Sequence, residues 1–268
     1  RIEGRFESDA ALSRLKVSIR GETASGGLIS RLIGLPGAPG VTVDLEGDGP
    51  VESFVARYAI AAGTAVGTEG EIRLSSAYPL ALKIKGIARV AEFAPLDLRL
   101  MIGDRVEYGL AASLNADSTL LEVVDLQVAT ALASANGSVK LRLDDLAVDA
   151  DLSAEVTRPD LLETMVTGLR IEGGGVDISA TGPVSRIDAK AKIWIDDVSF
   201  QDHRVGRIET VVTAALAETV KAAATITASG LDLPTVPAGA IGGTITGGAK
   251  AVLSGRSLSL SDLRARSG

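Results

Sequence analysis

The sequence predicts a mainly β protein, built as a long antiparallel sheet with two short helices. Most of the chain alternates apolar and polar residues with a period of two, as strands with one buried face do. Short turns rich in Gly, Pro, Asn and Asp separate runs of strand length. The runs leave no room for the crossover helices of a parallel sheet, so an antiparallel meander is expected.

The strands are predicted from rows of apolar residues at every second position. The clearest rows are Leu15, Val17, Ile19; Leu82, Ile84; Leu96, Leu98, Leu100, Ile102; Val139, Leu141, Leu143; and Ile187, Ala189, Ala191, Ile193, Ile195. Charged residues such as Lys83, Arg99 and Lys190 fall between them. The phase slips at Asp144-Asp145, which predicts a tight turn or a bulge there.

Turns are predicted where glycine, proline and asparagine cluster. The clusters are Gly47-Asp48-Gly49-Pro50, Gly103-Asp104, Asn136-Gly137, Thr181-Gly182-Pro183 and Ser254-Gly255-Arg256. Asn-Gly between two alternating runs is typical of a two-residue hairpin turn.

Two segments show helical spacing instead. Apolar residues recur at i, i+1, i+4 and i+5 in "GLISRLIG", from Leu28 to Ile33, and in "PDLLETMVTG", from Leu161 to Val166. Pro159 suits a first helical turn, and Gly34 and Gly168 suit the exits.

The chain also contains an internal repeat. Residues 28–60 align without a gap on residues 161–193, and both segments carry a helical stripe, a Gly-Pro-Val sequence and an alternating strand in one register. "LSLSDLRARSG" near the end similarly echoes "LLEVVDLQVAT". We therefore predict the end of a preceding repeat at 1–27, one repeat at 28–160, and a second, incomplete repeat at 161–268. The chain is interpreted as a piece of a longer protein.

Composition excludes several classes of function. The chain has 268 residues, no cysteine and a formal net charge of −7, so thiolate sites are excluded and nucleic acid is not expected as a partner. No apolar run is long enough to predict a membrane span. Mean hydropathy is high for such a chain, which indicates either an ordinary core or an apolar surface that faces a ligand.

No motif predicts catalysis, a cofactor or a metal. His203 is the only histidine and lies in a polar connection, where it lacks further ligands or a triad. The acid pairs 144–145 and 196–197 are explained by turn hydrogen bonding. The glycine runs 173–175 and 242–248 lack the remaining residues of a phosphate-binding loop. We predict that the protein is not an enzyme.

The repeat, with its phrases "LIGLPGAPGVTVDLEGDGPV" and "LSLSDLRARSG", resembles the TamB branch of the AsmA-like proteins, the inner-membrane component of the translocation and assembly module. The resemblance implies an elongated antiparallel sheet curled into a U-shaped trough (β-taco-like), in the periplasm of a Gram-negative bacterium and anchored to the inner membrane. It also implies bridge-like phospholipid transfer between the two membranes. An Omp85-type outer-membrane protein is the implied partner, bound through parts outside this chain.

An apolar trough matches phospholipid acyl chains, since each buried CH₂ contributes roughly 0.8 kcal/mol. Two alternatives stay open: a scaffold or chaperone that captures client strands at sheet edges to aid protein assembly and secretion, and an enzyme or adhesin on a β-solenoid or sandwich. The residues predicted to line the lipid groove are Phe54, Tyr58, Ile60, Leu82, Ile84, Leu96, Leu98, Leu100, Val139, Leu141, Leu143, Ile187, Ile193 and Ile195.

Overall fold

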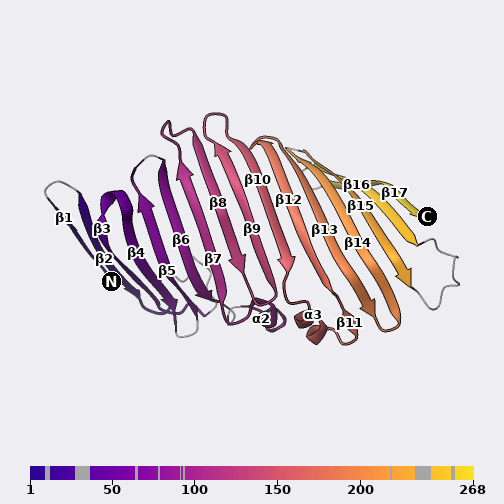
Figure 1. The fold of residues 1–268 in the computed structure, drawn as a ribbon, viewed down its shortest axis with the longest axis horizontal. Helices are drawn as coiled ribbons and strands as arrows, with labels where there is room; N and C mark the ends of the chain where they lie inside the picture. The colour runs from indigo at the N-terminus through magenta and orange to yellow at the C-terminus, as the bar shows by residue number, and fades with distance from the viewer. Residues whose placement is uncertain are drawn as a thin grey trace. The chain divides into compact units, whose positions relative to one another are not determined.

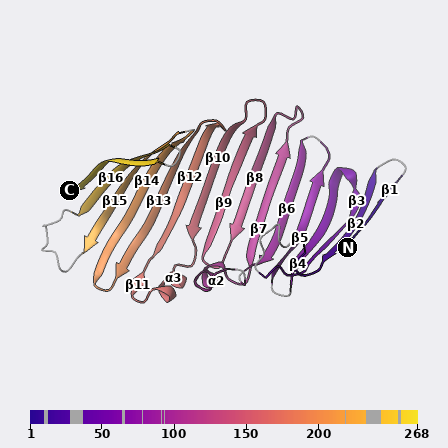
Figure 2. The same ribbon diagram turned by 180° about the vertical axis from the view of Figure 1, so that it is seen from behind.

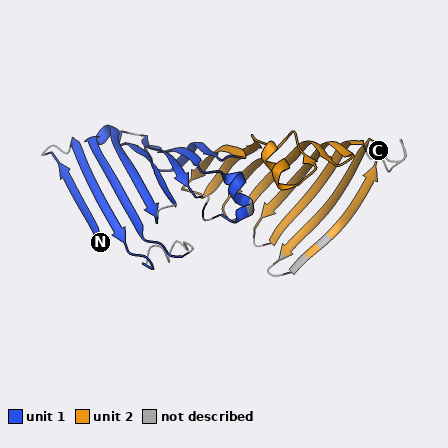
Figure 3. Cartoon of the chain, turned by 90° about the horizontal axis from the view of Figure 1, so that it is seen from below, with its two compact units in different colours: residues 1–131 blue, residues 132–268 orange. Residues whose placement is uncertain are grey.

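The predicted fold class is confirmed: the protein is mainly β, an open antiparallel sheet of 17 strands with two short α-helices among the described residues. The computed structural model describes residues 1–9, 13–27, 37–63, 66–77, 79–90, 92, 94–217, 219–232, 243–254 and 257–268. The chain divides into two compact units, Arg1–Ala131 and Leu132–Gly268, coloured separately in Figure 3. The curl into a trough stays a prediction.

Unit 1 is a meander in which each strand pairs with the next one along the chain (Figure 1). Its strands are β1 (Ile2–Ser8), β2 (Arg14–Thr23), β3 (Val41–Pro50), β4 (Phe54–Ala62), β5 (Val66–Ser75), β6 (Leu80–Arg89), β7 (Val106–Leu114) and β8 (Leu120–Ala129). A 3-10 turn, η1 (Val51–Ser53), joins β3 to β4, and α2 (Leu96–Ile102) lies between β6 and β7.

Unit 2 continues in the same style, as Figure 2 shows from behind. Its elements are β9 (Ala133–Arg142), β10 (Ala147–Val156), α3 (Asp160–Met165), β11 (Leu169–Arg170), β12 (Gly173–Pro183), β13 (Ile187–Phe200), β14 (His203–Leu216), β15 (Thr219–Asp232), β16 (Thr244–Ser254) and β17 (Ser257–Ser267). β10 pairs with β12, and the short β11 pairs with the end of β13. α3 confirms the second predicted helix, whereas the first falls outside the described residues.

The segment 96–102 corrects one prediction, because it is the helix α2 and not a strand. Pro95 precedes it, and Gly103, at φ 72°, ends it by donating its N–H to the carbonyl of Arg99. The Arg99 side chain also donates to the carbonyls of Glu92 and Ala94. Leucine, arginine and methionine are good helix formers, and these local bonds favour helix over the strand that alternation indicated.

Three turn predictions also need correction. The predicted turn Thr181-Gly182-Pro183 forms the end of β12, and the chain turns at residues 184–186 instead. Asn136 and Gly137 lie inside β9, opposite Ser153 and Leu152. The glycine serves the packing of the sheet there and not a turn, because the Leu152 side chain occupies the space that a side chain at position 137 would need. β3 runs through the predicted turn 47–50 as far as Pro50, and the chain turns at η1 instead. The phase slip at Asp144-Asp145 is a turn between β9 and β10, as predicted.

The two Gly-Pro hairpins have the same register. Gly47 pairs with Ala56 in the β3–β4 hairpin, and Ala180 pairs with Ala189 in the β12–β13 hairpin, both partners lying 133 positions later. In each hairpin a proline ends the first strand and three residues make the turn. The repeat boundaries at 28 and 161 differ from the division between the compact units and stay a prediction.

The echo between the two Asp-Leu segments has a structural counterpart. Asp125 in β8 and Asp262 in β17 both have positive φ, 53° and 55°. In each case the pairing with the previous strand shifts by one residue beside a glycine, Gly109 in β7 and Gly248 in β16. Each Asp-Leu pair therefore forms a bulge within one continuous strand, because the bulged strand carries one residue more than its partner.

Candidate functional site

The candidate site is the uncharged face of the sheet. Side chains directly opposite each other in paired strands share a face, so the register defines it. In unit 1, one cross-strand row of this face is Phe6, Val17, Gly47, Ala56, Ile72, Ile84 and Leu110. Apart from the bulge at Asp125, no Asp, Glu, Lys or Arg of the described strands β1–β8 falls on this face.

The opposite, charged face carries the ionic side chains of both signs. Arg14 pairs with Asp48 at 2.9 Å, and Arg20 pairs with Asp44 at 2.7 Å. These pairs are exposed to water, so each contributes little to folding. They keep one side of the sheet hydrated.

Unit 2 has an uncharged face of its own. One row holds Ala154, Val176, Ile193, Thr210 and Ile226. Toward the C-terminal end of β13 this face reaches Asp197, which has a positive φ of 50°.

Asp197 forms an ion pair with Arg204 of β14. Arg204 donates from Nε to Asp197 Oδ1 at 2.6 Å and from Nη2 to Asp197 Oδ2. The hydrogen bonds from Arg204 lower the pKa of the Asp197 carboxyl. A charged border therefore closes this end of the uncharged face of unit 2.

Large apolar side chains on both uncharged faces remain accessible to water. In unit 1 these include Phe6, Ile60 and Leu74; in unit 2 they include Leu152, Ile178, Ile193, Leu216, Ile226 and Leu253. Exposed apolar side chains gathered on one face mark a binding surface when they form a large patch.

A small core anchors the uncharged face of unit 1. Phe54 is 6% exposed, and its ring lies over Gly47 in contact range of Ala56 and Val17. Leu15, Ile19 and Leu45 pack around this cluster. The glycine lets the aromatic ring lie flat on the neighbouring strand.

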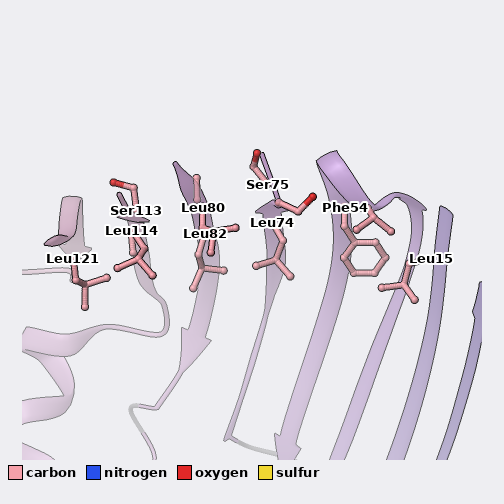
Figure 4. A pocket seen from close by; sticks show the side chains of 13 residues that line it. Leu15, Phe54, Leu74, Ser75, Leu80, Leu82, Ser113, Leu114 and Leu121 are labelled. Carbon is pink, nitrogen blue, oxygen red and sulfur yellow. The ribbon is translucent and has the colours of Figure 1, made fainter. Parts of the chain in front are cut away.

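An apolar pocket adjoins this core at the end of the sheet where β4 begins (Figure 4). Its volume is about 410 Å³. Phe54 lines it together with six leucines from five strands, which are Leu15, Leu74, Leu80, Leu82, Leu114 and Leu121. Two rows from it, the hydroxyls of Tyr58, Thr68 and Tyr108 form the polar centre of the same face.

The Tyr58 hydroxyl lies 2.5 Å from that of Tyr108, and Thr68 is hydrogen-bonded to Tyr108. Burial raises the pKa of Tyr58 to about 12, and the neighbouring Tyr108 adds to the effect. Tyr58 therefore stays protonated and neutral at any physiological pH.

The structure places the predicted groove residues in three groups. Phe54, Tyr58, Ile60, Leu82 and Ile84 lie on the uncharged face of unit 1. Val139, Leu141, Ile187, Ile193 and Ile195 lie on that of unit 2. Their role in lipid binding stays a prediction.

The third group does not join the strand rows. Leu96, Leu98 and Leu100 lie on α2, where alternate residues point in different directions, and Leu96 is 76% exposed. Leu143 is exposed in the turn between β9 and β10, because the strand ends at Arg142.

Sequence reasoning missed several residues of the same face, including Ile72, Leu74, Tyr108 and Leu110. The alternation in "VGTEGEIRL" and "VEYGLAASL" carries the signal, but the glycines and alanines make it weak. Trp194 lies on the charged face, opposite Glu209.

No protein-family model, curated protein or solved structure matches the chain. Among the described residues no cluster of His, Asp and Glu has the geometry to hold a metal ion. None of the described helices has the length and apolar character to span a membrane.

Proposed function

We propose that this chain is a segment of a bridge-like lipid-transfer protein, which moves phospholipid between the inner and outer membranes along an apolar groove. The observation that carries the proposal is the separation of charge by face. Every charged strand residue of unit 1 outside the Asp125 bulge shares one face, while large apolar side chains stand accessible on the other. The resemblance to TamB and AsmA-like proteins in repeat style supports the same function.

The chemistry of the face favours acyl chains as the occupant. Acyl chains need an apolar surface without unpaired charges, because burying an isolated charge is costly. The rows of Ala, Val, Leu and Ile meet that need, and a zwitterionic or anionic head group can remain in water at the rim. Neighbouring rows have similar composition, so a lipid can move along the face without a deep energy minimum at any one position.

Photo-crosslinking in cells tests this proposal. A photo-reactive residue at Leu82 faces the uncharged side, and one at the adjacent Lys83 faces the charged side, in the same strand. Phospholipid adducts at position 82 and none at position 83 are the expected result. Lipid at neither position refutes lipid transfer along this face, and adducts to proteins alone support the scaffold alternative in its place.

A further inference from the structure

Tyr58 and Tyr108 form a bridge across two strands on the uncharged face of unit 1. Tyr58 in β4, Gly70 in β5, Gly86 in β6 and Tyr108 in β7 occupy one cross-strand row. The two rings extend toward each other over the glycines, and their hydroxyls meet at 2.5 Å. We use "tyrosine bridge" below for Tyr58, Tyr108 and the adjacent Thr68.

The two glycines are required by this geometry. A Cβ atom at Gly70 would lie 2.7 Å from the Tyr58 hydroxyl oxygen. At Gly86 it would lie 2.5 Å from that oxygen and 2.6 Å from the Tyr108 hydroxyl oxygen. The bridge thus lies close against the backbone and leaves the space above it free for a ligand.

The bridge retains hydrogen-bonding capacity. Three hydroxyl groups carry three donor hydrogens and six acceptor lone pairs. The two hydrogen bonds of the bridge, Tyr58 with Tyr108 and Thr68 with Tyr108, use two donors and two lone pairs. One donor hydrogen and four lone pairs remain, and both tyrosines are only half-buried, so a ligand on this face can reach them.

The surroundings select a neutral polar group as the ligand. A phosphate or carboxylate would find no cation, since the Lys and Arg residues of these strands lie on the charged face. An ester carbonyl is a neutral acceptor that matches a neutral hydroxyl donor. The pocket begins at Phe54, four residues from Tyr58 along β4, which is about 13 Å at roughly 3.3 Å per residue. A long acyl chain can span that distance.

We propose that the tyrosine bridge binds the ester carbonyl of an acyl-ester lipid whose hydrocarbon chain extends along the uncharged face into the apolar pocket. This inference rests on the proposed function, because it assigns a recognition element to the same face. The bridge gives a lipid a shallow preferred position in unit 1, where most other side chains of the uncharged face are apolar.

Two lipids that differ only in the ester carbonyls test the inference. Binding of pyrene-labelled diacyl phosphatidylcholine is compared with binding of its dialkyl ether analogue, using the full chain. One hydrogen bond of ordinary net strength predicts an ester preference of about fivefold. The double variant Tyr58→Phe/Tyr108→Phe is expected to bind both lipids with the affinity that the native chain has for the ether lipid. Ser18→Ala, which removes a hydroxyl from the charged face of the same unit, is expected to keep the preference.

The outcomes are distinguishable. Equal binding of both lipids by the native chain overturns the tyrosine bridge as an ester site but leaves lipid transfer intact. A preference that survives in the double variant, or disappears in Ser18→Ala, also overturns it. Binding of neither lipid instead argues against the proposed function. If the double variant does not fold, Tyr58→Phe alone gives the same comparison.

Discussion

The ring of Phe54 occupies the space over Gly47 where a Cβ atom would stand. Gly47→Ala would bring that atom against Phe54 Cζ, and within 2.9 Å of both Ala56 Cβ and the carbonyl oxygen of Val55. The ring must move, so the free energy of unfolding is expected to fall by about 1–3 kcal/mol. Urea unfolding measures this loss. Gly49→Ala, on the same face of the same strand, is the control, since no atom would approach its Cβ closer than 3.8 Å.

Trp194, the single tryptophan, reports on the pairing of β12 with β13. Its indole ring covers Gly175, where a Cβ atom would lie 2.5 Å from Trp194 Cζ2. Gly175→Val is expected to displace the indole into water, shifting its fluorescence emission to the red and increasing its quenching by iodide. Gly173→Ala should change neither, because the space around that glycine is open. An unchanged spectrum in Gly175→Val would show that the indole does not lie on this strand.

Ile226 and Thr225 offer a matched comparison of the two faces. Both side chains are exposed on β15, but Ile226 lies on the uncharged face and Thr225 on the charged one. Ile226→Asp is expected to reduce phospholipid binding at least tenfold, because an acyl chain there would desolvate an unpaired carboxylate. Thr225→Asp should bind as the native chain does. Thermal unfolding of both variants checks that the sheet is intact, and equal lipid binding by the two contradicts a role for this face.

The ion pair of Asp197 with Arg204 makes stability depend on acid. The Asp197 pKa is lower in the folded chain than in the unfolded chain, so its contribution to stability is present above about pH 4 and is lost as the pH falls through the folded pKa. Asp197→Asn keeps a residue that tolerates positive φ. It should lower the urea midpoint near neutral pH, and this difference should vanish at the lowest pH.

Alternation alone predicted the faces of β4, β6, β9 and β13, because a strand with one uncharged face carries apolar residues at every second position. It failed at α2, where leucine at alternate positions fits a strand and a helix equally well. The helix is favoured by Pro95 before it, by Gly103 after it, and by the hydrogen bond from the Arg99 side chain to the carbonyl of Ala94. These are local contacts, which the alternation of apolar residues does not reveal.

The tyrosine bridge could not be predicted from the sequence pattern for a different reason. Tyr58 was predicted as a groove residue, but its partner Tyr108 is 50 positions away and meets it only through the pairing of four strands. The bulges at Asp125 and Asp262 were similarly invisible, since they depend on a glycine in the neighbouring strand.

The shared register of the two Gly-Pro hairpins bears on how such a chain can change in length. Joining Pro50 directly to Val184 would remove 133 residues and still set β3 against β13 with Gly47 opposite Ala189, as Gly47 now faces Ala56. The apolar side of each strand would keep its orientation across the junction. Duplication or loss of one whole repeat can therefore lengthen or shorten the sheet without changing which face is apolar. Selection can then adjust the length of the sheet in fixed steps of one repeat.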